Sequence, residues 1–411
     1  MNRKLIKIAL RNISRNKRRS ILSGSAIAVA AMSIVALFSL IEGMSADMAF
    51  NLKTYYTGEV LIKHADYEKY ERYNPMHLTV DWNSIDITLA KEESVDTYVP
   101  RITFPSNLYI SGSNFGAIGV GADFAKEADF QDLKGSLKAG RLPETGQNEM
   151  MMGGVLARDL KLKIGDKVTV MSTTAARGTN AITLEIVGLF AFPVGALNSK
   201  YFWVPLDRAQ YFLRMDDGVQ EVLIKLNDGF TSREAAPVIK TAVESQAEIE
   251  MDIRPWEELS TTYGMLKMAQ MIYNFIAMFF FLLGSTVIIN TTMMVIFERM
   301  REIGTLGALG MHGKELVRMF FLEGTFISMI GSAVGVAIGV LLTLWLGKVG
   351  IDYTDAMSGM DFEMSSIVFP QLSIGKTVFV YFYSVAIASA ATFIPSRHAA
   401  KIEPVEALRY V

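Results

Sequence analysis

The stretch ILSGSAIAVAAMSIVALFSLI, residues 21–41, decides the fold of this chain because it contains no charged residue. The hydrocarbon core of a membrane is about 30 Å thick, and a helix needs about 20 apolar residues to cross it. The preceding residues 1–20 carry eight lysines or arginines and no acidic residue. Basic residues beside a span tend to stay in the cytoplasm. The sequence therefore predicts a transmembrane helix at 21–41 that follows a cytoplasmic N-terminus.

Three further segments have the length and composition of membrane spans. They are 268–297, then 319–346 with Glu323 near one end, and 374–394, which we expect Pro395 to close. The 411 residues are 51% hydrophobic and 20% charged, with a mean hydropathy of +0.27. A soluble protein carries about a quarter charged residues, so burial in lipid has to explain the apolar excess. The sequence therefore predicts four transmembrane helices.

The excess of basic residues in cytoplasmic loops also assigns a side to each remaining segment. It places 298–318 and the tail 395–411 in the cytoplasm, and the loop 347–373 outside. Residues 45–267 carry about eight more acidic than basic residues, as expected for an outside domain. We predict a membrane α-helical fold with four transmembrane helices and a large extracytoplasmic, periplasmic α+β domain, residues 42–267, between the first and second helices.

The N-terminal residues allow alternative interpretations. A cleavable signal peptide also has a basic start, but its apolar core is usually about 7–15 residues long and a small-residue cleavage site follows. The run at 21–41 is longer and no clean site follows it, so we predict a retained anchor. Within 1–20, Leu5, Ile8 and Ile13 have helical spacing. This spacing predicts a basic amphipathic helix on the inner membrane surface, with a basic flank that only sets topology as the alternative.

The outside domain contains strand and turn signals between two helical stalks, 42–56 and 256–267. Segments rich in β-branched and aromatic residues read as strands: GEVLIKH (58–64), DTYVPRITF (96–104), NLYISG (107–112), KIGDKVTVMS (163–172) and ITLEIVGLF (182–190). The last two predict a hairpin with a polar connection at 173–180. Helical signals also occur, so the domain is predicted to be α+β.

No pattern of residues indicates a catalytic centre or a metal site. The chain has no cysteine, and its four histidines lack the spacing of metal ligands. The motifs GxSxG, HExxH and GxxxxGK[ST] are absent. The sequence therefore predicts that this chain is not an enzyme and binds no cofactor. If ATP is used, another chain binds it.

The third span carries small residues at helical spacing: Gly324, Ser328, Gly331, Gly335 and Gly339. Glycine lets helix backbones approach closely in lipid, where van der Waals contact drives association. We predict that these residues pack against other helices of the bundle. A path for a substrate is the alternative.

Three stretches resemble the FtsX-like permeases of ABC transporters, the group that includes macrolide exporters and lipoprotein-releasing permeases. They are ALRNISRNKRRS (9–20), FERMREIGTLGALGMHGKELVRMFFLEG (297–324) and IPSRHAAKIEPVEALRYV (394–411). The outside domain is similar too, in KGSLKAGRLPETGQNEMMMGGVLARDLKLKIGDKVTV (134–170) and YFWVPLDRAQYFL (201–213). Residues 39–70 are most similar to the lipoprotein-release, or Lol, type.

The resemblance implies a multi-pass protein of the bacterial inner membrane with cytoplasmic termini. It also implies that two permeases, identical or different, pair with a dimer of ABC ATPase subunits, which hold ATP and magnesium. The short helix of the middle loop would dock on the ATPase and transmit its closure. The residues that fall on this coupling motif are Glu298, Arg299, Arg301, Glu302, Gly304, Leu306, Ala308, Leu309 and Gly310. The tail residues Pro404, Glu406, Ala407 and Leu408 would lie beside the same partner.

Lipoprotein-release permeases hold a periplasmic carrier with a protruding hairpin. The matching place here is 171–181, where Thr173, Thr174, Arg177 and Asn180 are candidates for docking a carrier; a plain hairpin turn is the alternative. The sequence predicts no nucleic-acid partner.

Three functions are therefore considered. The first is ATP-driven extraction or release of lipoproteins or other amphiphiles at the outer face of the inner membrane. The second is tripartite efflux of drugs or peptides with an adaptor. The third is regulation of a cell-wall hydrolase, for which the outside domain is large.

Overall fold

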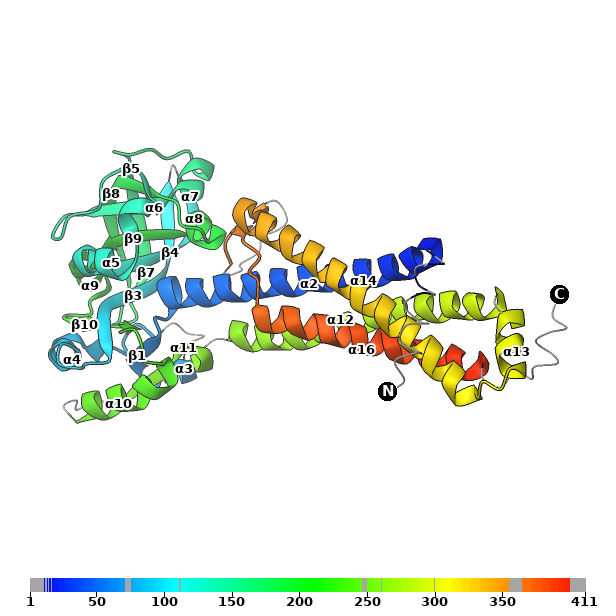
Figure 1. The fold of residues 1–411 in the computed structure, drawn as a ribbon. Coiled ribbons are helices and arrows are strands. Elements are labelled where there is room, and N and C mark those ends of the chain that lie inside the picture. Colours follow the sequence, from blue (N-terminus) through cyan, green and yellow to red (C-terminus); the bar gives the residue numbers. More distant parts are fainter. Residues whose placement is uncertain are drawn as a thin grey trace. The chain divides into compact units, whose positions relative to one another are not determined.

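The computed structural model describes residues 11, 13, 15, 17–70, 75–110, 112–245, 250–259, 261–298, 300–354 and 364–399 (Figure 1). The chain divides into two compact units. Unit 1 comprises Met1–Ser45, Met265–Ile351 and Val368–Val411, and unit 2 comprises Ala46–Gly264 and Asp352–Ile367.

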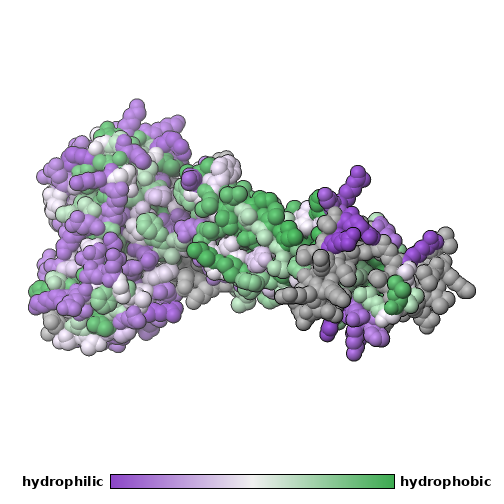
Figure 2. Space-filling view, in the orientation of Figure 1, coloured by the Kyte–Doolittle hydropathy of each residue, from purple (hydrophilic) through white to green (hydrophobic). Residues whose placement is uncertain are grey.

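Long helices make up unit 1. They are α2 (Lys17–Asn51), which extends into unit 2, α12 (Thr261–Glu298), α14 (Gly313–Val349) and α16 (Ile374–Ala399), with the short helix α13 (Met300–Ala308) after α12. Buried apolar residues of α2, including Ala31, Ile34 and Val35, pack with Val380 of α16. Figure 2 shows apolar residues gathered over these helices.

Within the described residues, three helices are long and apolar enough to cross a membrane: Ser20–Tyr56, Gly313–Val349 and Ile374–Arg397. The fourth predicted span, 268–297, lies within the 38-residue helix α12. The α+β domain lies between α2 and α12 in the chain, so the predicted four-helix membrane fold is confirmed.

The prediction that Pro395 closes the last span is wrong, because α16 continues through it to Ala399. A proline removes one backbone donor and leaves the carbonyl oxygen four residues back, here that of Ala391, without its helical partner, a change that membrane helices tolerate.

Unit 2 is an α+β domain. Its strands are β1 (Val60–His64), β2 (Val80–Asp81), β3 (Val95–Ile110), β4 (Ser113–Ala122), β5 (Leu137–Gly140), β6 (Glu149–Gly153), β7 (Lys167–Thr173), β8 (Thr179–Phe190), β9 (Tyr201–Pro205), β10 (Gly218–Val219), β11 (Glu221–Leu226) and β12 (Met251–Pro255). Its helices are the π-helix η1 (Leu52–Tyr56), α3 (Tyr67–Tyr70), α4 (Trp82–Leu89), α5 (Phe124–Phe130), α6 (Leu133–Ser136), α7 (Gly154–Asp159), α8 (Gly195–Lys200), α9 (Leu206–Leu213), α10 (Ser232–Glu244) and α11 (Trp256–Leu259). Two short strands, β13 (Ile351–Asp352) and β14 (Ile367–Val368), pair with each other.

One ten-stranded sheet organises the domain. Its strand order is β12-β1-β11-β3-β4-β9-β6-β8-β5, and β7 pairs with both β3 and β8. The pairs β4–β9 and β6–β8 are parallel and the others are antiparallel. The largest core cluster includes Phe104, whose ring meets those of Phe202 and Phe212 edge to face, with centroids 6.0 and 5.9 Å away.

The structure differs from the expected strands and loops in two places. DTYVPRITF and NLYISG, expected as separate strands, form the single 16-residue strand β3. Residues 352–367, expected in a simple outside loop, belong to unit 2, because Ser365 bridges to Val194 and the Ser366 amide donates to the Pro193 carbonyl oxygen.

Candidate functional site

The predicted coupling segment folds as helix α13 and the turn that follows it. One side of α13 is buried: Met300 and Ile303 are covered, and Ile303 belongs to a cluster with Leu316, Met319 and Phe320 of α14. The other side is open, since Arg301, Thr305, Ala308 and Leu309 are exposed, and Leu309 exposes 80% of its surface. A short amphipathic helix of this kind can rest on its own bundle and offer its open side to a partner.

The turn after α13 has a defined geometry. The Leu309 amide donates to the Thr305 carbonyl oxygen, and Gly310 has a φ of +93°, which favours glycine. α14 then begins at a capping box, in which the His312 amide donates to Glu315 Oε2 at 3.3 Å.

Among the other predicted coupling residues, Gly304 is buried and Glu298 is exposed. Arg299 and the tail residues Pro404, Glu406, Ala407 and Leu408 lie outside the described residues, as do the side chains of Glu302 and Leu306.

The small residues of α14 lie against two different helices. A side chain added at Gly331, Gly335 or Gly339 would meet α2 at Gly24, Ala28 and Val35 respectively. A side chain added at Gly324 would meet Thr392 of α16.

Hydroxyl pairs join α14 to α16, and the sequence analysis missed most of them. Ser328 and Ser389 lie 3.3 Å apart, and the Ser384 hydroxyl donates to the Ser332 hydroxyl at 2.7 Å. All four serines are buried. The spacing of serines within one span does not show which serine of that span meets which serine of another helix.

The β7–β8 hairpin closes tightly between Thr173 and Thr179, which are paired. Its turn is fastened to α9: the Ala175 amide donates to the Leu213 carbonyl oxygen, and Asn180 Nδ2 donates to the Phe212 carbonyl oxygen at 2.8 Å. Asn180 therefore holds the turn in place.

A cavity of about 590 Å³ lies beside this turn. It is lined by Tyr70, Pro75, Met76, His77, Thr173, Thr174, Ala175 and Arg177. The Thr174 hydroxyl is buried and has no hydrogen-bond partner within the described part of the chain. Three of the four candidate docking residues thus line one cavity, and Asn180 does not line it.

A buried ion pair connects η1, β3 and α5. The Arg101 guanidinium donates to both carboxylate oxygens of Glu127, at 2.6 and 2.9 Å, and its third bond, at 2.6 Å, reaches the Tyr55 carbonyl oxygen in η1. Arg101 is 2% exposed and Glu127 is fully buried. Gln131 also donates to Glu127 at 2.6 Å. We call these four residues the Arg101 network. Because η1 directly follows α2, this network fastens the end of that helix to the sheet of unit 2.

A second junction lies at the end of α2. The Asp47 carboxylate accepts the Ser365 hydroxyl at 2.6 Å and the Ser365 amide at 2.8 Å, and Asn51 Nδ2 donates to Asp47 at 3.0 Å. The segment around Ser365 is thereby held both by α2 and, through Val194, by the domain. The sequence analysis had no signal for this contact, because the partners are 318 residues apart.

Within the described residues, no group of His, Cys, Asp or Glu side chains could hold a metal ion. His312 begins α14, and His77 lines the cavity beside the hairpin.

Comparisons with known proteins place the chain in a family. The MacB-like periplasmic core domain matches residues 20–242, and the FtsX-like permease C-terminal region matches residues 274–404. A lipoprotein-releasing system transmembrane protein LolC of Neisseria meningitidis serogroup B is 22% identical over 344 residues, which cover 80% of this chain and 82% of that protein. A LolC of Xylella fastidiosa (strain Temecula1) is 24% identical over 69% of this chain and 71% of that protein.

A probable export ATP-binding/permease protein MacB of Pseudomonas entomophila is 24% identical over 55% of this chain and 32% of that protein. The crystal structure of the periplasmic region of MacB from Actinobacillus actinomycetemcomitans aligns with 52% of this chain and 95% of its own, at 16% identity and a TM-score of 0.38. Since the periplasmic-core match alone covers more than half of the residues, the chain belongs to the FtsX-like permeases with a MacB-like periplasmic core domain, and it is an ABC transporter permease of the bacterial inner membrane.

Proposed function

We propose that this permease couples ATP hydrolysis by a partner ATPase to the extraction or release of lipoproteins or other amphiphiles at the outer face of the inner membrane. The observation that carries the proposal is the alignment with a lipoprotein-releasing LolC over 344 residues, which extends over most of both chains. In this proposal ATP and magnesium are held by the partner, and this chain supplies the membrane helices and the periplasmic domain.

The coupling residues support a docking role for α13 on the cytoplasmic side. The Leu309 and Arg301 side chains are both exposed, whereas Ile303 holds the helix to its own bundle. A groove on an ATPase could bury Leu309 and Arg301 without disturbing Ile303. This role requires both termini and α13 to be cytoplasmic, with a second permease, identical or different, completing the complex.

The two junctions of unit 2 support transmission into the periplasmic domain. ATP binding can shift a conformational equilibrium only through different affinities for its two states. A displacement of the end of α2 would reach β3 through the Arg101 network and the 364–367 segment through Asp47. We propose that these contacts carry the movement that does the work outside.

The cavity beside the β7–β8 turn, with its threonine and arginine side chains, supports a docking place for a periplasmic carrier or adaptor. Arg177, Thr173 and Thr174 would meet a polar partner there. The turn is short and is hydrogen-bonded to α9, so a carrier or adaptor would be recognised at the cavity rather than by a protruding hairpin.

Tripartite efflux of a drug or peptide is the second candidate, and the similarity to MacB proteins favours it. One assay distinguishes lipoprotein release from tripartite efflux. The permease and its ATPase are reconstituted in liposomes that carry a triacylated lipoprotein in the outward-facing leaflet. ATP-dependent appearance of lipoprotein in the soluble fraction supports release. ATP hydrolysis without release across a panel of lipoproteins, together with a requirement for an adaptor, would instead support efflux.

A further inference from the structure

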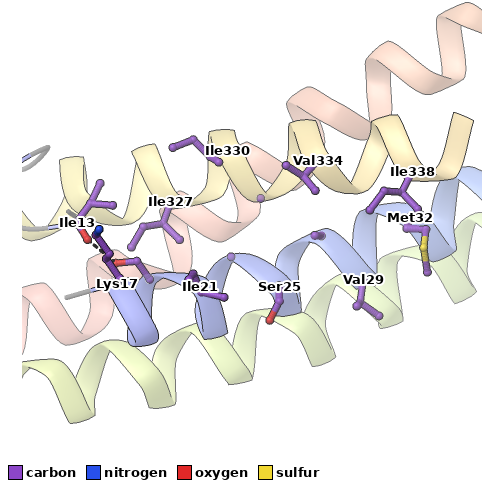
Figure 3. Close-up of a pocket in the computed structure, with 14 residues that line it drawn as sticks. Ile13, Lys17, Ile21, Ser25, Val29, Met32, Ile327, Ile330, Val334 and Ile338 are labelled. Atoms are coloured by element: carbon purple, nitrogen blue, oxygen red, sulfur yellow. Dashed lines mark hydrogen bonds between the residues drawn. The ribbon is translucent and has the colours of Figure 1, made fainter. Parts of the chain in front are cut away.

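An apolar groove of about 570 Å³ runs along α2 and α14 within unit 1 (Figure 3). Lys17 and Ile13 lie at one end of the groove and Met32 lies at the other. Its walls are large apolar side chains that remain exposed, among them Ile21 at 68% and Ile330 at 59%.

The groove follows from how the two helices approach each other. Gly331 and Gly335 let α14 come into contact with the α2 backbone at Gly24 and Ala28. Beside this line of close contact the small Ser25 leaves space. The residues at the crossing are small and those on both sides are large. The surface there is therefore a narrow groove rather than a flat face.

The dimensions of the groove fit one acyl chain. Along α14 it extends from Ile327 to Ile338, which is about 16 Å at 1.5 Å per residue. One leaflet of a hydrocarbon core about 30 Å thick has nearly the same depth.

The positive charge at one end of the groove favours a lipid with an anionic headgroup. Lys17 lines the end of the groove and its side chain is exposed. Arg11, Arg15 and Arg18 belong to the same basic stretch and are also exposed. An acyl chain gains little by moving from lipid into an apolar groove, so selectivity has to come from the headgroup. Basic residues at a membrane surface attract anionic lipids.

We propose that this groove binds one anionic phospholipid of the cytoplasmic leaflet, with an acyl chain along α2 and α14 and the phosphate at Lys17. The inference rests on the proposed cytoplasmic N-terminus. It describes a resident lipid, distinct from an amphiphile that leaves from the outer leaflet.

The test uses the full chain, purified and exchanged into mixed micelles of phosphatidylglycerol and phosphatidylethanolamine, with retained lipid counted by native mass spectrometry. The wild type should retain one phosphatidylglycerol in preference to phosphatidylethanolamine. Lys17→Gln should lower this preference about fivefold, the effect of one base near the surface. Lys17→Arg should keep it.

Ser25→Phe fills the groove and should abolish retention, whereas Thr286→Phe, on the exposed side of α12, should not. Equal retention by Ser25→Phe and the wild type would overturn the proposal. So would no preference for phosphatidylglycerol, or a photoreactive residue at Val334 that crosslinks to a second copy of the chain instead of lipid. Lipoprotein release is scored separately. Release without a retained lipid removes only this inference, and a retained lipid without release removes only the proposed function.

Discussion

Arg101→Met should strongly destabilise the periplasmic domain, because it leaves the Glu127 carboxylate buried without its charged partner. The wild-type arginine makes two bonds to Glu127 and one to the Tyr55 carbonyl oxygen, and its guanidinium lies 5.2 Å from the Trp203 ring centroid. After substitution, Gln131 is the remaining side-chain donor to Glu127 recorded within the described residues. Breaking one partner of a buried ion pair costs about 3–5 kcal/mol.

For a domain of about 220 residues, 1 kcal/mol corresponds to a change of about 2–4 °C in Tm, so the expected loss is about 6–20 °C. The assay is thermal unfolding of the full chain in detergent, followed by tryptophan fluorescence. The double variant Arg101→Met/Glu127→Leu should recover most of the loss, because a buried pair replaced by apolar residues is often neutral or better. A single variant within about 2 °C of the wild type would refute the reasoning.

The double variant also distinguishes the contribution of the Arg101 network to domain stability from its proposed role in transmitting movement from α2. It restores a neutral core but leaves the Tyr55 carbonyl oxygen without the Arg101 bond. We expect a stable protein with near-normal ATP hydrolysis and less substrate released per ATP. Unchanged release per ATP would show that the Arg101 network has only a structural role.

Three further predictions concern the bundle, α13 and the surface of the domain. Gly335→Ala places a methyl group against the α2 backbone and should cost about 1–3 kcal/mol in a thermal shift assay, whereas Gly375→Ala, with no neighbour within 4 Å, should be nearly neutral. Leu309→Asn should leave the Tm unchanged because Leu309 is exposed, and should lower ATP hydrolysis stimulated by the permease; normal stimulation would exclude Leu309 from the coupling contact. The Arg141 hydrogen bond lowers the pKa of Glu149, so this pair stabilises the domain above the ordinary carboxyl pKa of about 4.3 and the contribution disappears as the pH falls through the lowered value. In pH-dependent unfolding, Glu149→Gln should therefore be less stable than the wild type at pH 7 and should lose less stability on acidification; parallel curves would contradict this.

The sequence predicted the parts of the fold that local pattern determines. Long apolar runs predicted the membrane helices, and β-branched residues predicted the strands β1, β7 and β8. Pro395 predicted the wrong end for α16, because a proline ends a helix in water more often than in a membrane. Pro100 and Pro105 lie within the single strand β3, which sequence alone divided into two segments.

The long-range contacts could not be predicted, because one sequence does not show which residues meet. Arg101 and Glu127 are 26 residues apart and each resembles an ordinary surface charge in the sequence. Asp47 and Ser365 lie on segments that the sequence predicts as a stalk and a separate loop. The lining of the cavity beside the hairpin joins Tyr70 and His77 to residues about 100 positions later. The motif residues of α13 could be named in advance, but only the structure shows which of them are exposed.

The most direct test of the account is the side of the membrane on which α13 lies, because the proposed coupling to an ATPase requires it to be cytoplasmic. The chain has no cysteine, so Leu309→Cys and Lys138→Cys are clean single reporters, and both positions are exposed. We expect a membrane-impermeant maleimide added to spheroplasts to label Lys138→Cys at once and Leu309→Cys only after lysis. Labelling of Leu309→Cys in intact spheroplasts would contradict the account.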